Sequence, residues 1–237
     1  MDPHLRTLID LQALDTRIAA LDADAARIPK QIEAIQAAVQ EARKTLDALK
    51  ARQDTARKDL RAKEKDLEVV TAKRAKGEAR LYEVKTNKEY SAVLTEIEDI
   101  KQEKSRTEEE ILGLMELGER LSADIREAES RHTTREEQGT QDEAAARQRL
   151  ATVERELAGV RGERATLARE LPKGLLGDYE RVLKARAGLG IAPVNAAGVC
   201  GGCRVAIRPQ AIQEIRSGTA LTHCESCGRF LYWQDTA

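Results

Sequence analysis

The fold follows from residues 11–49, which read LQALDTRIAALDADAARIPKQIEAIQAAVQEARKTLDAL. Apolar side chains recur there at steps of seven from Leu11 and again three residues after each step, and the pattern continues to Val84. Of the 22 positions in these two series, 18 are apolar when alanine is counted. A heptad repeat of this length predicts a left-handed coiled coil, so the helix must pack against a second helix. Pro29 keeps the phase of the repeat, which predicts a kink rather than a break.

The composition is typical of long helices. Charged residues make up 34% of the 237 residues and aromatic residues only 3%, whereas a compact core of this size would contain many aromatic side chains. These values exclude an ordinary globular enzyme over most of the chain. The net charge of −1 argues against a polybasic nucleic-acid-binding protein. No apolar run has the length of a membrane span, and the first residues lack the features of a secretory signal, so we expect a cytoplasmic protein without membrane contact.

Proline and glycine indicate where the chain changes character. Residues 30–171 contain no proline, and glycine becomes frequent only from residue 174 onward. We predict a hairpin domain over 1–171 and a second domain over 172–237, made of a short helix, a linker and a cysteine-containing module. The expected fold class is mainly α: a long antiparallel coiled-coil helical hairpin with a small C-terminal β module.

The hairpin needs a turn, and its predicted tip is Lys85, Thr86, Asn87, Lys88, Glu89 and Tyr90. Thr86 followed three residues later by Glu89 is a capping-box signature, and Asn87 tolerates turn geometry. The arms on the two sides of this turn are nearly equal in length. That equality favours an antiparallel hairpin over one continuous helix that pairs with a second copy.

Charge supports the pairing of the two arms. Residues 43–85 carry 14 basic and 8 acidic side chains, and residues 88–130, which lie opposite in such a hairpin, carry 6 basic and 13 acidic ones. Neutralisation by the partner helix explains the basic stretch, although each exposed ion pair contributes little. A nucleic-acid-binding surface is the alternative explanation.

One segment fits the repeat badly. Residues 126–149 contain no large apolar side chain, yet they should lie opposite an apolar stripe of the first helix. Either the second helix loosens or kinks near Gly139 and is covered by alanine and long side-chain stems, or the stripe is a surface for a second copy or a protein partner. The candidate partner-surface residues are Ile28, Ile32, Ile35 and Val39.

The strongest chemical signal is two Cys-x-x-Cys pairs separated by 20 residues. Such a spacing predicts one structural Zn²⁺ ion held by four thiolates, and the predicted ligands are Cys200, Cys203, Cys224 and Cys227. The small C-terminal β module is therefore expected to be a C4 zinc ribbon. A closed four-cysteine shell leaves no position for substrate, and a thioredoxin-type redox site needs only one such pair. We expect short strands over 204–207 and 230–233 and a helix over 209–216 that stops at Gly218. The helices offer no catalytic triad or phosphate-binding loop, so we do not expect an enzyme.

The end of the ribbon suggests a nucleic-acid-binding surface. Alternation along residues 230–233 places one side-chain pair on the ribbon core and leaves the other pair partly exposed. Exposed aromatic side chains beside arginine can stack on unpaired bases. The candidate residues are Arg204, Arg208, Arg229, Tyr232 and Trp233.

The tip and the ribbon resemble those of a bacterial family with an N-terminal coiled-coil hairpin and a C-terminal C4-type zinc ribbon, described as predicted nucleic-acid-binding zinc-ribbon proteins. The resemblance covers the whole chain and rests on residues 85–90, 199–203 and 224–233. Many members have proline where this chain has Glu225. The resemblance implies a non-enzymatic regulatory or adaptor role. For some members it implies a link to flagellar or secretion systems through an alternative sigma factor or a messenger RNA.

Two functions follow from these observations. In the first, the hairpin binds a protein partner, such as a sigma factor or other transcription component. The ribbon then contacts single-stranded RNA or DNA, or the transcription or translation machinery. In the second, the chain is a structural protein–protein adaptor whose ribbon only stabilises the fold. In both cases we expect the ribbon to have a core separate from that of the helices.

Overall fold

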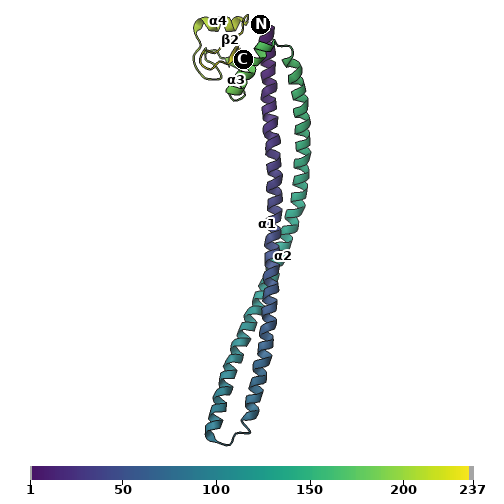
Figure 1. Ribbon diagram of the computed structural model, residues 1–237, viewed down its shortest axis with the longest axis vertical. Helices are drawn as coiled ribbons and strands as arrows, with labels where there is room; N and C mark the ends of the chain where they lie inside the picture. The colour runs from purple at the N-terminus through teal and green to yellow at the C-terminus, as the bar shows by residue number, and fades with distance from the viewer. Residues whose placement is uncertain (1, 235–237) are drawn as a thin grey trace. The chain divides into compact units, whose positions relative to one another are not determined.

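The computed structural model describes residues 2–234, which form four helices and three short strands (Figure 1). The predicted mainly α fold class is confirmed. The chain divides into two compact units: one joins the segments up to Glu33 and from Glu143 onward, and the other is Ala34–Asp142. In chain order the elements are α1 (Pro3–Arg80), α2 (Asn87–Ala168), α3 (Lys173–Ala185), β1 (Ile191–Val194), α4 (Pro209–Ser217), β2 (Thr222–His223) and β3 (Phe230–Trp233).

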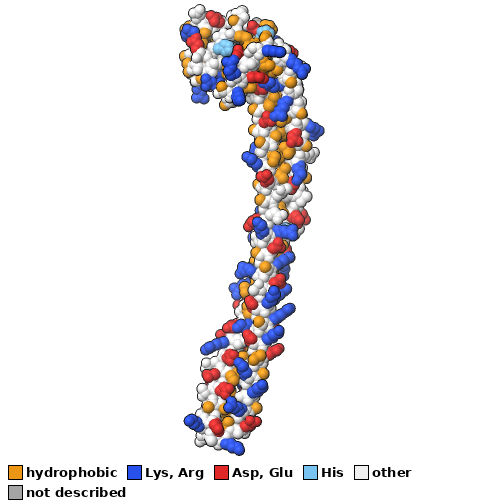
Figure 2. Space-filling model, viewed as in Figure 1, with side chains coloured by type: hydrophobic (Ala, Val, Ile, Leu, Met, Phe, Trp, Pro, Cys, Tyr) orange, Lys and Arg blue, Asp and Glu red, His pale blue; other side chains and the backbone are white. Residues whose placement is uncertain are grey.

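Within the unit Ala34–Asp142, α1 and α2 run antiparallel. Their cross-helix ion pairs are Lys50–Glu129, Lys63–Glu110, Lys73–Glu103 and Arg80–Glu96. In these pairs the residue number on α2 falls as the residue number on α1 rises, as expected for two antiparallel helices. Basic and acidic side chains are interspersed along these helices (Figure 2). Each pair is largely exposed and contributes little stability, but together the four pairs match the basic stretch of α1 to the acidic stretch of α2.

The turn between α1 and α2 is built as the sequence predicts. After Arg80 a short turn covers residues 81–83, and α2 begins at Asn87. The Glu89 carboxylate accepts hydrogen bonds from the Thr86 hydroxyl, at 2.8 Å, and from the Thr86 amide, while the Glu89 amide donates to the Thr86 hydroxyl. The hydroxyl donor lowers the pKa of Glu89. The capping box is therefore complete and fixes the start of α2.

The apolar-poor segment of α2 does not loosen. The helix continues unbroken through Gly139. Gly139 is buried, and a Cβ atom at this position would lie 2.8 Å from Cγ2 of Val39 and 3.5 Å from Cγ2 of Ile35. The missing side chain allows the two helices to approach closely. Ile35 and Val39 are thus covered by the α2 backbone instead of by large side chains.

The same contacts bear on the expected partner surface of α1. Ile28 has no exposed surface, so its assignment to a partner surface is wrong. Ile32, Ile35 and Val39 are half-buried within the single chain. These residues behave as hairpin core. Pro29, next to Ile28, lies inside α1, which continues through it, and the predicted absence of a break is confirmed.

The ribbon sheet has the strand order β1-β3-β2. Strand β1 pairs in parallel with β3, with Ile191 opposite Phe230, and β2 pairs antiparallel to β3, with His223 opposite Phe230. Helix α4 is ended by Gly218, whose φ of 61° is the left-handed conformation that glycine favours. The strand expected over residues 204–207 is wrong, because this segment forms only an isolated bridge between Ala206 and Val199.

The ribbon and the helix ends share a core, so the expectation of separate cores is wrong. Leu8 and Leu11 of α1 are fully buried in one cluster with Phe230 of β3 and Ile191 of β1. The remaining members of this junction core are Leu5, Ala168, Leu171 and Tyr179. Helices, α3 and ribbon are therefore stabilised by the same apolar contacts.

A buried glutamine side chain adds polar contacts to the junction. Gln12 of α1 accepts hydrogen bonds at its Oε1 from the amides of Gly190, at 2.6 Å, and Ile191, at 3.3 Å. Its Nε2 donates to the Gly188 carbonyl at 2.8 Å. The backbone amides and the carbonyl of the segment that leads into β1 are thus hydrogen-bonded to a side chain of α1. These bonds hold the start of the ribbon against α1.

Tyr179 connects α3 to both long helices. Its hydroxyl donates to Asp15 Oδ2 at 2.9 Å, and the Arg164 guanidinium donates to the same carboxylate at 2.7 Å. Burial, followed by the neighbouring Asp15 charge, raises the pKa of Tyr179, which therefore remains a protonated donor at neutral pH.

Over the part of the chain that the structure describes, no helix is long and apolar enough to span a bilayer.

The junction core predicts a strong effect of a small substitution. Gly190→Ala would place a methyl group 2.5 Å from Cε2 of the fully buried Tyr179 ring, which its bond to Asp15 holds in place. We expect a loss of about 1–3 kcal/mol in the free energy of unfolding of the unit that holds the ribbon, measured by thermal denaturation. The matched control is Gly177→Ala, because a Cβ there has no neighbour within 4 Å. It should be neutral or stabilise α3 by up to about 1 kcal/mol. Equal stability of the two variants would contradict the packing.

Candidate metal centre

The four predicted cysteines lie together at one end of the ribbon. Their sulfur atoms lie within 4.8 Å of one another, with 3.9 Å between Cys200 and Cys227 and 3.6 Å between Cys203 and Cys224. A tetrahedral zinc ion with bonds of about 2.3 Å requires sulfur atoms about 3.8 Å apart. The side chains present therefore fit one structural Zn²⁺ ion, as the sequence predicts.

Each cysteine pair sits on the same kind of tight turn. In the first, the Arg204 amide donates to the Cys200 carbonyl at 2.8 Å, and in the second the Gly228 amide donates to the Cys224 carbonyl at 2.7 Å. The residue that closes each turn has a left-handed backbone, with φ of 61° at Arg204 and 75° at Gly228. The two turns are thus equivalent, but only the second has the glycine that this conformation favours.

The protein environment affects the four thiols differently. Burial raises the pKa of Cys200 to about 12 and also raises that of Cys224. At Cys227 burial acts in the same direction, but hydrogen bonds from the backbone and side chain of Arg229 outweigh it and lower the pKa to about 6. Zinc binds thiolates, so metal binding must displace protons from the thiols with the raised pKa.

Two arginines attach the second cysteine turn to the segment that follows α3. Arg186 donates from Nε to the Cys227 carbonyl at 2.9 Å. Arg229 donates from Nε to the Leu189 carbonyl at 2.9 Å and from Nη2 to the Arg186 carbonyl at 3.1 Å. Sequence analysis missed Arg186, because nothing in its local sequence indicates a partner 41 residues away.

The aromatic face expected to bind bases is not open. Alternation along β3 occurs as predicted, but both faces are used. Phe230 and Tyr232 pack on the junction core, while Leu231 and Trp233 pack with the cysteines. Trp233 is further covered by Arg216, whose guanidinium carbon lies 4.1 Å from the ring centroid. Tyr232 and Trp233 are therefore half-buried parts of the fold.

The arginines proposed to flank that face are also largely engaged. Arg229 is bonded to backbone carbonyls, and Arg208 forms an ion pair with Glu225. Arg204 is exposed, and so is Arg208 although it is paired with Glu225. The five predicted nucleic-acid-binding residues thus do not form one available surface.

Comparison with known proteins identifies both parts of the chain. The family model described as a CT398-like coiled coil hairpin domain matches residues 11–187, and that of a C4-type zinc ribbon domain matches residues 199–231. The chain belongs to the CT398-like coiled-coil hairpin family. The hairpin match passes the predicted boundary at residue 171 and includes α3. No curated protein matches the chain.

Solved structures show the same fold over nearly the whole length. CT398 from Chlamydia trachomatis is 22% identical, with 97% of each chain covered and a TM-score of 0.83. HP0958 from Helicobacter pylori is 19% identical, with 99% of each chain covered and a TM-score of 0.65. A protein from Mycobacterium smegmatis is 22% identical, with 97% of each chain covered and a TM-score of 0.69.

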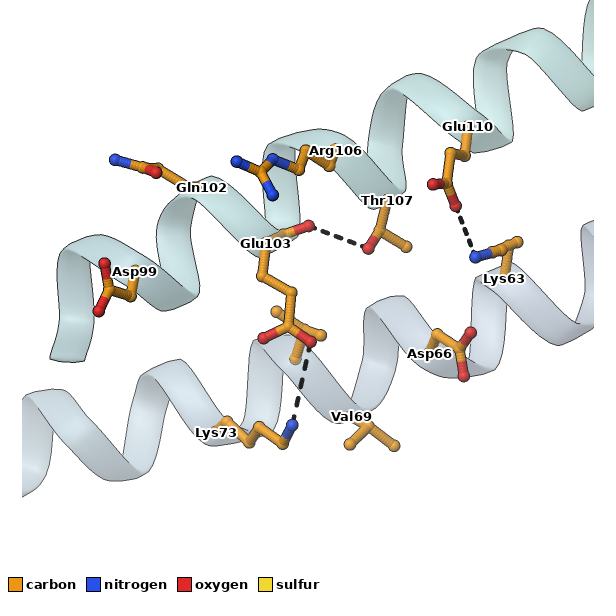
Figure 3. A pocket seen from close by; sticks show the side chains of 11 residues that line it. Lys63, Asp66, Val69, Lys73, Asp99, Gln102, Glu103, Arg106, Thr107 and Glu110 are labelled. Carbon is orange, nitrogen blue, oxygen red and sulfur yellow. Dashed lines mark hydrogen bonds and ion pairs between the residues drawn. The ribbon is translucent and has the colours of Figure 1, made fainter.

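The CT398-like hairpin also has a charged cleft between α1 and α2, in the unit Ala34–Asp142, with a volume of about 660 Å³. Figure 3 shows Glu110 pointing at Lys63 and Glu103 at Lys73, the ion pairs that link the two helices here. Thr107, the buried polar residue beside them, donates to the Glu103 carbonyl at 3.0 Å. Two lysines of this cleft thus pair with glutamates of the facing helix, while Asp66, Asp99 and Arg106 also line it, and such a charged lining is typical of a solvated helix seam.

The shared core predicts that loss of zinc also destabilises the N-terminal end of α1. Removing zinc with a chelator, or replacing Cys224 with Ser, should release β3 and with it Phe230. Amides of residues 5–11 should then lose protection from hydrogen exchange, measured by mass spectrometry, while residues 46–56 keep theirs. Glu225→Ala, which removes a neighbouring charge but no ligand, is the control. Unchanged protection at residues 5–11 would show that the cores are independent.

The two cysteine turns predict opposite effects of glycine exchange. Arg204→Gly should relieve the left-handed strain and favour the zinc-bound fold by about 1 kcal/mol, whereas Gly228→Ala should disfavour it by a similar amount. Competition for zinc with a chromogenic chelator measures both changes. A weaker zinc affinity of Arg204→Gly would contradict the equivalence of the turns.

Proposed function

We propose that this chain is a non-catalytic adaptor whose coiled-coil hairpin binds a protein partner and whose zinc ribbon is a structural element fixed to the helix ends. The carrying observation is that the ribbon uses the aromatic side chains of β3 and the Arg229 side chain internally. Tyr232 packs on the junction core, Trp233 lies under Arg216, and Arg229 is bonded to the segment after α3.

The metal chemistry supports a structural role. Four cysteine ligands close the zinc coordination shell, so the ion has no open position at which water or substrate could bind. A bound zinc ion would cross-link the two cysteine turns. A ribbon of this size buries too little apolar surface to be stable without such a cross-link.

The proposed partner is a protein in the cytoplasm, where the thiols stay reduced and can hold zinc. A sigma factor or other transcription component, as the family resemblance implies, belongs to this class of partner. A coiled-coil hairpin supports the role because it displays a long surface while its own core stays closed.

Binding of single-stranded RNA or DNA by the ribbon is the second candidate function. One observation favours it: Arg204 and Arg208 are both exposed, although Arg208 is paired with Glu225. Two arginines, one of them already paired, neutralise too little phosphate charge for tight binding, since affinity grows with the number of phosphates contacted.

The adaptor hypothesis predicts a complex that survives nuclease treatment. The tagged full chain, purified from its native cells, should retain the same protein partner in the same ratio after digestion of RNA and DNA. The purified zinc-loaded chain should show no salt-dependent binding to fluorescent single-stranded RNA or DNA pools, and Arg204→Ala should change nothing. Loss of the partner on digestion, or direct binding that Arg204→Ala weakens, would favour the nucleic-acid function instead.

A further inference from the structure

The two aromatic residues of the unit Ala34–Asp142 both lie at the hairpin tip. Tyr82 is 92% exposed and Tyr90 is 48% exposed, while the other four aromatic residues of the chain are buried or half-buried in the unit that holds the ribbon. Tyr82 and Tyr90 therefore contribute little to the hairpin core. Exposed tyrosines of this kind are frequent in protein-binding surfaces, where tyrosine is among the residues that contribute most affinity.

A third exposed apolar residue extends this surface along α2. Leu94 is 44% exposed and follows Tyr90 by four residues, so the two side chains lie on the same face of the helix. Val93, between them, is buried against α1 instead. The face formed by Tyr90 and Leu94 is thus directed away from the helix pair.

The tip holds these residues on a fixed backbone. The Thr86–Glu89 capping box starts α2, and the amides of Tyr82 and Glu83 donate to the carbonyls of Ala79 and Arg80. A groove of about 530 Å³ lies beside the turn. Its lining is mainly polar and charged, with Lys85 and three glutamates beside Val84, Ala92 and Val93. A partner that binds here does not have to order the backbone first, which lowers the entropic cost of binding.

Charge at the tip distinguishes between kinds of partner. Over residues 81–90 two lysines are balanced by two glutamates, so the surface has no net charge to attract phosphates. One of these glutamates, Glu89, already accepts hydrogen bonds from Thr86. Among the described residues, Lys85 and Lys88 have no ion-pair partner. A partner carboxylate can form a single local ion pair with each lysine, whereas a nucleic acid depends on net positive charge that faces several phosphates and gains little here.

We propose that the hairpin tip, comprising Tyr82, Lys85, Lys88, Tyr90 and Leu94, is the docking site of the protein partner. The partner presents a segment with apolar side chains, which pack on the tyrosines and Leu94, flanked by carboxylates that pair with the two lysines. This inference rests on the proposed adaptor function and adds the location and chemistry of the contact.

A random peptide library displayed on phage tests the tip directly. Selection on the full-length zinc-loaded chain should enrich peptides that combine apolar residues with Asp or Glu. Their affinities, measured by fluorescence anisotropy, should fall at least about tenfold with Y82S/Y90S, because such tyrosines carry much of the binding energy. The charge reversal K85E/K88E should also weaken binding.

The matched control is L112S. Leu112 is another exposed apolar residue of α2, at 59%, but lies outside the tip, so its loss should leave peptide affinity unchanged. All variants should keep the helical circular dichroism and melting temperature of the unmodified chain, because none of the substituted side chains is buried.

The outcomes separate this inference from the function on which it rests. Peptides that bind Y82S/Y90S as well as the unmodified chain would overturn the tip site but leave a protein adaptor with another binding surface. Enrichment of basic peptides would overturn the proposed charge pairing. Selection of no peptide would overturn the tip site, while the nuclease experiment decides the adaptor function. Binding of a single-stranded RNA pool that is lost in Y82S/Y90S would overturn both in favour of nucleic acid.

Discussion

Zinc coordination holds β3 in place, and β3 connects the two cores of the unit that contains the ribbon. Leu231 packs with the cysteines, whereas Phe230, one residue earlier, packs with Leu8 and Leu11 of α1. Because successive side chains of a strand point to opposite faces, one short strand serves both cores. A zinc ion bound by the four cysteines would therefore stabilise the ends of the long helices together with a ribbon that has too few apolar residues to fold alone.

Sequence analysis predicts the features that depend on local or periodic patterns. The heptad repeat identifies the paired helices, the spacing from Thr86 to Glu89 identifies the start of α2, and Gly218 identifies the end of α4. The four zinc ligands follow from the spacing of two cysteine pairs. Each of these features is specified by residues a few positions apart, so no knowledge of the tertiary structure is needed to find it.

The features that sequence analysis misses depend on contacts between distant residues. The hydrogen bond from Gly190 to Gln12 joins residues 178 positions apart, and neither residue is unusual in its own segment. Gly139 resembles a weak point of α2 until Val39 is found packed on it. The role of Arg229 was misassigned for the same reason: an arginine beside aromatic residues suggests nucleic acid, whereas its acceptors are the carbonyls of Leu189 and Arg186.

The two groups of aromatic residues are under different constraints. Tyr179 and Phe230 are fully buried in the junction, so a change there alters packing and stability. Tyr82 is almost fully exposed, and the paired helices beside it obtain their stability from the inward positions of the heptads. Substitutions at the tip can therefore change its surface without unfolding the hairpin. Substitutions in the junction core cannot change the surface in this way, because the same side chains hold the ribbon against the helices.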